Sequence, residues 1–173
     1  MNKRFVFINA ILTFAVSFLV HNIYKWLPSV ITTIFPVNES LFEHMKLIFI
    51  SPIISSVIVY WFFRKKDKII NNYLFGLIVS IIFNIIIFYL VYLPVYYSVG
   101  QSMFMTLSIY FITIVMSNYL YYLIIEMKNN HKLNIISFFV IVVIGGILTY
   151  FTYNPIKIDF FRDPITKVYG IPK

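Results

Sequence analysis

The chain has 173 residues, of which 61% are hydrophobic and only 12% are charged. Soluble domains are usually about 45–50% apolar with roughly a quarter of their residues charged, so a single soluble core could not bury this much apolar surface. Apolar runs of about 20 residues match the thickness of a bilayer's hydrocarbon core, about 30 Å. The composition therefore predicts an all-α polytopic bundle of transmembrane helices that contacts the lipid bilayer.

The formal net charge of +8 does not indicate nucleic-acid binding. Lys and Arg fall in short clusters between the apolar runs, which is typical of topology signals in membrane proteins. We therefore expect no nucleic-acid partner. The sequence also lacks cysteine, which excludes disulfides, zinc–thiolate sites and cysteine nucleophiles.

The first predicted span covers about residues 5–27 and follows the basic pair Lys3-Arg4. A secretory signal peptide also begins with positive charge and an apolar run. Here the apolar run continues beyond the weak cleavage pattern at residues 15–17, so we predict an uncleaved helix. The link that follows, residues 28–37, is too short to cross a bilayer.

Four further spans follow, and together the five make a transmembrane domain over residues 1–153. Asn154-Pro155 ends the last span, and residues 154–173 are predicted to form a polar extracytoplasmic tail. The third span is expected to stop near Pro94, because proline interrupts the helical hydrogen-bond ladder. The four further spans are expected at about 40–63, 70–93, 102–125 and 133–153.

The distribution of Lys and Arg predicts the orientation of the chain. Basic residues are concentrated at 3–4, 64–68 and 128–132, which share one face of a five-span bundle. Because cytoplasmic loops carry an excess of positive charge, we expect the N-terminus inside and the C-terminus outside.

Residues 36–46 are dense in charge for this sequence and stand at the outer start of the second span. Counting about 30 Å back from Arg64 ends near His44. His21 lies about 25 Å along the first span from Arg4, at a similar depth. The topology therefore predicts an outer-face cluster from three separate segments of the chain, formed by His21, Glu39, Glu43, His44, Lys46, Arg162 and Asp163.

Part of this cluster has a purely structural interpretation. Asn38 or Ser40 is suited to cap the second helix, and Glu43 stands where a capping box requires it. Glu43 and Lys46 are spaced i,i+3 and can neutralise each other. An ionic network that ties the second helix to the C-terminal tail would account for the remaining charges.

A divalent metal site is the chemical alternative. His21, His44 and Glu39 are candidate ligands, and Glu43 is a candidate catalytic base. Glu43 and His44 are adjacent and point about 100° apart on a helix, so they cannot chelate one ion together. A metal site would need ligands from different segments of the chain.

Three features inside the spans add a transport hypothesis. Asn84 and Asn118 lie deep in the third and fourth spans, and Pro52 interrupts the second. Buried asparagines commonly form polar contacts between helices, but they also line transport paths.

The motif PVNES-x-x-EH-x-K at residues 36–46 and the motif FRDP-x-x-x-x-YG at 161–170, with His21 upstream, resemble an uncharacterised family. This family, a domain of unknown function, comprises small bacterial multi-span membrane proteins. The resemblance implies a multi-pass protein of the bacterial cytoplasmic membrane. It implies no activity or ligand.

Three functional hypotheses remain open from the sequence. The first is a non-catalytic membrane component whose outer cluster ties the second helix to the tail or binds a membrane-protein partner or another copy. The second is a metal-assisted hydrolase embedded at the outer leaflet. The third is a small transporter.

Overall fold

The structure, a computed structural model, describes residues 4–64, 70–100 and 102–171. Within these residues five helices are each long and apolar enough to cross a membrane. Most of the basic cluster at 64–68 and Lys3 lie outside the described residues. The helices are α1 (Arg4–Trp26), α2 (Leu41–Arg64), α3 (Tyr73–Val99), α4 (Met103–Ile125) and α5 (His131–Tyr153).

Helix α3 continues through Pro94 to Val99 instead of stopping near residue 93. Proline removes only one backbone donor from the ladder. The helix can therefore continue through Pro94 with the loss of one hydrogen bond, and it ends at Gly100, whose φ of +86° does not fit a helix.

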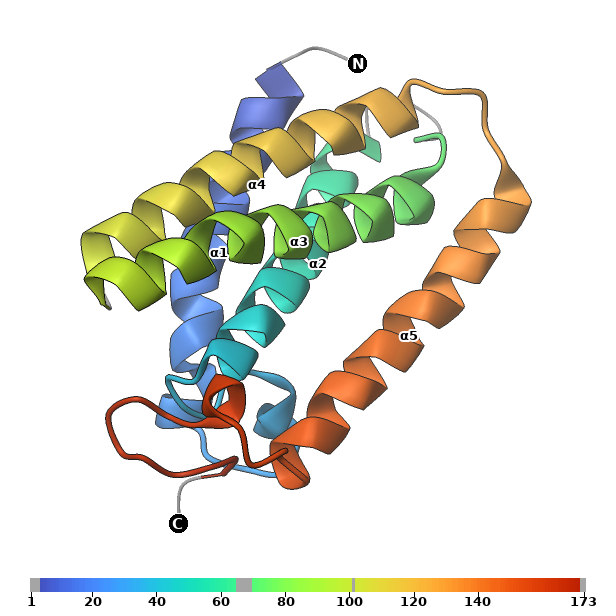
Figure 1. Cartoon of the computed structure of the whole chain (residues 1–173). Coiled ribbons are helices and arrows are strands. Elements are labelled where there is room, and N and C mark those ends of the chain that lie inside the picture. The colour runs from blue at the N-terminus through green and yellow to red at the C-terminus, as the bar shows by residue number, and fades with distance from the viewer. Residues whose placement is uncertain (1–3, 65–69, 101, 172–173) are drawn as a thin grey trace.

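Helices α1 to α4 form a compact group, and α5 stands to one side of it (Figure 1). Helix α1 packs against α2 and α4, and α3 packs against α2, α4 and α5. Polar side chains join some of these helices inside the bundle. Asn9 of α1 hydrogen-bonds Asn118 of α4, whereas Asn84 of α3 is buried and has no hydrogen-bond partner among the described residues.

Short segments close one end of the bundle, where α1 ends and α2 begins (Figure 1). The link after α1 forms a 3-10 helix, η1 (Ile31–Ile34), and the tail contains a second one, η2 (Asp159–Phe161). The Phe161 ring stacks on Phe42 of α2, with centroids 4.4 Å apart. The C-terminal tail is therefore packed against the start of α2.

Candidate metal site and adjoining pocket

The start of α2 is shaped by side-chain hydrogen bonds to the backbone. The Ser40 hydroxyl accepts from the Glu43 N–H at 3.3 Å, and the Asn38 side-chain oxygen accepts from the Ser40 N–H at 2.8 Å. The Glu43 carboxylate accepts from the Val37 N–H at 3.1 Å, whereas a capping box would direct it to Ser40. These bonds fold residues 37–40 against the helix and place Glu39 beside α1.

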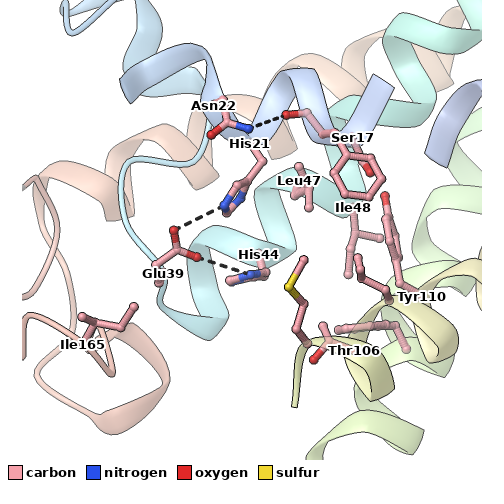
Figure 2. A pocket seen from close by; sticks show the side chains of 14 residues that line it. Ser17, His21, Asn22, Glu39, His44, Leu47, Ile48, Thr106, Tyr110 and Ile165 are labelled. Atoms are coloured by element: carbon pink, nitrogen blue, oxygen red, sulfur yellow. Dashed lines mark hydrogen bonds and ion pairs between the residues drawn. The ribbon is translucent and has the colours of Figure 1, made fainter. Parts of the chain in front are cut away.

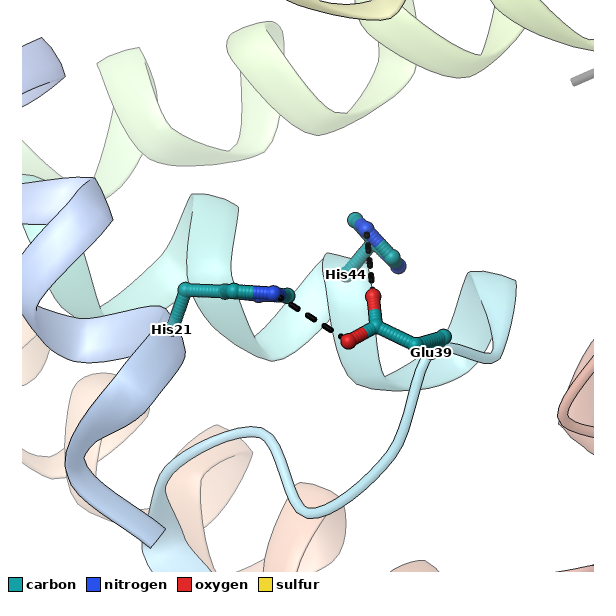
Figure 3. A group of neighbouring side chains, drawn as sticks. All are labelled: His21, Glu39 and His44. Atoms are coloured by element: carbon teal, nitrogen blue, oxygen red, sulfur yellow. Dashed lines mark ion pairs between the residues drawn. The ribbon is translucent and has the colours of Figure 1, made fainter. Parts of the chain in front are cut away.

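His21, Glu39 and His44 meet at this end of the bundle (Figure 3). Their candidate ligand atoms all lie within 4.8 Å of one another. The Glu39 carboxylate is 3.3 Å from His21 Nε2 and 3.9 Å from His44 Nε2, and the two imidazole rings are 5.7 Å apart between centroids. The three side chains come from α1, the link before α2, and the first turn of α2.

The contact made by His44 Nδ1 decides which nitrogen of the ring carries the hydrogen. His44 Nδ1 lies 2.9 Å from the Ser40 carbonyl oxygen. A carbonyl oxygen can only accept, so Nδ1 carries the hydrogen and the lone pair is on Nε2. Nε2 is the nitrogen that faces Glu39. A backbone carbonyl that fixes the imidazole in this way is a common outer partner of metal-binding histidines.

Glu39 is held in its ionised form. The hydrogen bond from His21 is the main reason that the pKa of Glu39 falls to about 2; burial opposes the shift, and Lys25 adds to it. The Lys25 ammonium donates to Glu39 Oε1 at 2.7 Å. A metal ligand must be deprotonated, and Glu39 meets this condition at any physiological pH.

A cavity of about 580 Å³ adjoins the three side chains (Figure 2). His21, Glu39 and His44 lie at one end of it, and the rest of its wall is mainly apolar. The wall comes from α1, α2, α3 and α4, and Ile165 of the tail completes it. The polar groups Ser17, Thr106 and Tyr110 also face this cavity. The candidate ligands therefore open into a pocket whose remaining wall is mainly apolar and carries a few uncharged polar groups.

Glu43 and Lys46 belong to a different group, because neither lines this pocket. Their charged groups lie 2.7 Å apart, and neither side chain is more than 1% exposed. Lys46 also donates to the Thr33 carbonyl and to the Thr152 hydroxyl, and the Thr152 hydroxyl donates to Glu43. Five of the seven predicted residues thus form two groups at the start of α2, one shared with α1 (His21, Glu39 and His44) and one that contacts Thr152 of α5 (Glu43 and Lys46).

Asp163 and Arg162 occupy different environments in the tail. The Asp163 carboxylate accepts from the N–H groups of Ile165, Thr166 and Glu39. Burial raises the pKa of Asp163, but these donors outweigh it and bring the pKa below its ordinary value. Arg162 lines a small cleft beside His44 and Glu39, and its Nε donates to the Lys167 carbonyl.

Two partners of the cluster were not predicted from the sequence. Lys25 pairs with Glu39, and Thr152 lies between Glu43 and Lys46. Lys25 follows His21 by four residues, so both are on the same face of α1, and this spacing could have indicated it. Thr152 has no such signal, because a single threonine in an apolar span usually bonds its own helix backbone.

The sequence comparisons identify the family but no activity. Residues 1–171 match the Family of unknown function (DUF6512). The chain belongs to this family. No curated protein and no solved structure matches the chain with significant similarity. A function must therefore be argued from the geometry of the site.

Proposed function

We propose that this chain is a membrane protein that binds a divalent transition-metal ion and uses it for hydrolysis at the outer end of the bundle. The ligands are His44 Nε2, the Glu39 carboxylate and His21 Nε2, which would lose the hydrogen that it donates to Glu39 when the ion binds. The single observation that supports this proposal is their convergence, with ligand atoms within 4.8 Å of one another at the edge of a pocket.

The type and number of the ligands favour zinc chemistry. Two imidazoles and one carboxylate form a ligand set that catalytic zinc sites use, and such sites keep a fourth position for water or substrate. Ligand atoms around a tetrahedral ion with bonds of about 2.1 Å lie about 3.4 Å apart. The three side chains are each 21–26% exposed, so small side-chain rotations can bring their atoms to that spacing.

A bound ion would face the pocket, because all three ligands line it. Such an ion polarises a carbonyl or phosphoryl oxygen and lowers the pKa of bound water to about 7. Glu43 has no part in this proposal, because its carboxylate is buried against Lys46 outside the pocket.

The same region has a structural role in the proposal. The Glu39 N–H donates to Asp163 at 3.3 Å, and the Asn38 amide donates to the Gly170 carbonyl at 2.7 Å. These two bonds support the inference that the residues before α2 hold the tail in place. Glu39 then contributes its backbone to the tail and its carboxylate to the ion.

We further propose that the protein lies in the bacterial cytoplasmic membrane with its N-terminus inside. Five apolar helices support a multi-pass arrangement. An odd number of spans would put the start of α1 and the tail on opposite faces. The clusters of Lys and Arg on the N-terminal face favour that face as the cytoplasmic one.

The metal content of purified protein tests the proposed site. The protein is equilibrated with Zn²⁺ in detergent, desalted, and measured by elemental mass spectrometry. We expect equimolar zinc in the wild type and a loss of zinc in His44→Ala and His21→Ala. The third histidine of the chain, His131, supplies the matched control, and His131→Ala should retain zinc. Equal zinc in the wild type and His44→Ala would overturn the proposal.

A further inference from the structure

We propose that the pocket receives one acyl chain of a phosphate-bearing membrane lipid, and that a phosphate oxygen of this lipid takes the open position on the ion. This inference rests on the proposed function, since it names the class of molecule that the same site binds. It is supported by the chemistry of the pocket wall, the position of the entrance and the charges at the polar end.

The wall of the pocket matches an amphiphile. Its volume, about 580 Å³, is within the range of about 300–1,000 Å³ that is usual for small-molecule sites. Leu47, Ile48, Phe88 and Leu107 give it an apolar body, while His21, Glu39 and His44 mark one end. A fully polar ligand would leave the apolar wall uncovered, and a plain hydrocarbon would leave the charged end without a partner.

The entrance of the pocket lies where lipid can enter. Phe18, Met103 and Ile165 line the pocket and are also 43%, 74% and 70% exposed on the surface of the molecule. Met103 begins α4 and Ile165 belongs to the tail, whereas Phe18 lies about two turns before the end of α1, so the entrance extends from the end of the spans along the side of α1. The headgroup region of a bilayer lies at the end of the spans. An acyl chain can therefore enter sideways while its head stays at the interface.

The polar end favours an anionic head. Lys25 pairs with Glu39 beside the pocket, and the proposed ion would add two positive charges next to this single carboxylate. Helix α2 begins at this end, and His44, from its first turn, lines the pocket. Helix N-termini stabilise negative charge and commonly bind phosphate. The proposed ion, the Lys25 ammonium and the start of α2 would therefore all attract a phosphate group.

Phosphorus NMR tests this inference directly. The full chain is loaded with paramagnetic Co²⁺ in a maltoside detergent, which contains no phosphorus, and titrated with 1-palmitoyl lysophosphatidic acid. A phosphate bound to cobalt has a strongly broadened ³¹P resonance. We expect broadening with the wild type and none with the Zn²⁺-loaded protein, because Zn²⁺ is diamagnetic.

Pocket-filling variants separate the acyl chain from the ion. Leu107→Trp fills the pocket, and Met103→Trp obstructs its exposed entrance. Both should retain equimolar cobalt and lose at least about tenfold in lipid affinity, which corresponds to about 1.4 kcal/mol. Ile112→Trp is the matched control, because Ile112 is 58% exposed on the same helix and does not line the pocket. Lipid affinity of both pocket variants equal to that of Ile112→Trp would overturn the inference.

Two competing ligands complete the experiment. Inorganic phosphate at the same concentration should give little broadening, and palmitate should compete at least about tenfold more weakly than the lysolipid. Equal broadening by inorganic phosphate would show simple anion binding, and equal competition by palmitate would show a carboxylate site, so either result overturns the inference. A wild-type chain that binds no cobalt would instead contradict the proposed function.

Discussion

The Glu43 carboxylate and the Lys46 ammonium lie 2.7 Å apart at the start of α2, and the side chains are 1% and 0% exposed. Burial of two charges is costly unless both are paired and hydrogen-bonded. The Val37 N–H, the Thr33 carbonyl and the Thr152 hydroxyl supply the remaining hydrogen bonds. The pair therefore connects α2 to α5 and to the link before α2.

Removal of one partner of this pair should be more damaging than removal of both. Lys46→Met leaves the Glu43 carboxylate buried and unpaired, a change that typically costs about 3–5 kcal/mol. The double variant Glu43→Gln/Lys46→Met has no buried charge and should recover part of this loss. Thermal unfolding in detergent measures both. A double variant that unfolds at or below the temperature of Lys46→Met would contradict this account.

Zinc should stabilise the folded protein through His21, Glu39 and His44. A ligand at about 100 times its Kd stabilises the native state by about 2.7 kcal/mol, so the melting temperature should rise on addition of Zn²⁺ and return after chelation. His21→Ala should show no such rise, whereas His131→Ala should behave as the wild type. If His21→Ala shows the same rise, zinc acts elsewhere on the chain.

Asp163 should determine how firmly the tail is held. Asp163→Ala removes the acceptor of three backbone N–H groups, one of them from Glu39. Hydrogen bonds to charged groups contribute about 1.5–3 kcal/mol each, so we expect trypsin to cleave at Lys157, Arg162 and Lys167 several-fold faster. The exposed Asp159 offers the control. Equal cleavage rates in Asp159→Ala and Asp163→Ala would show that other contacts hold the tail.

Gly170 should tolerate no side chain. Its φ is +66°, and a Cβ there would lie 2.6 Å from the Thr152 carbonyl oxygen. Gly100 also has a positive φ, +86°, but a Cβ there meets nothing within 4 Å. With ψ at −174°, Gly100 occupies a backbone region that is nearly restricted to glycine, so Gly100→Ala should cost about 1–3 kcal/mol of backbone strain, and Gly170→Ala should lower the melting temperature further because its Cβ also meets backbone. Similar melting temperatures for the two variants would mean that the tail moves away from α5 at little cost.

Much of the architecture follows from composition and helix length. The apolar runs predict all-α spans, and the structure has five apolar helices of spanning length. The end of α3 differs from the expectation, because Pro94 is accommodated within the helix. Proline removes one hydrogen bond from a helix, and the positive φ of Gly100, six residues later, is what ends α3.

For the candidate site, the sequence predicts the depth of each residue, and the tertiary structure decides which residues meet. Helix rise alone puts His21 and His44 at a similar depth, and the adjacency of Glu43 and His44 puts their side chains on different faces of α2. The packing of α1 against α2, and the position of Thr152 near the end of α5, decide which charge meets which partner. Depth depends on distance along the chain. Proximity between helices depends on how their faces pack, because contacts between segments more than 100 residues apart have no local signature.

The charged run at residues 36–46 is thus explained at two levels. By itself the sequence determined that these charges stand at the start of an apolar span, where each of them needs a partner. The i,i+3 spacing also indicated that Glu43 and Lys46 could pair, but only the tertiary structure decided that this pair is out of contact with solvent, while Glu39 and His44 meet His21 at the edge of the pocket. The physical reason is the helix itself, which presents neighbouring residues to different surroundings.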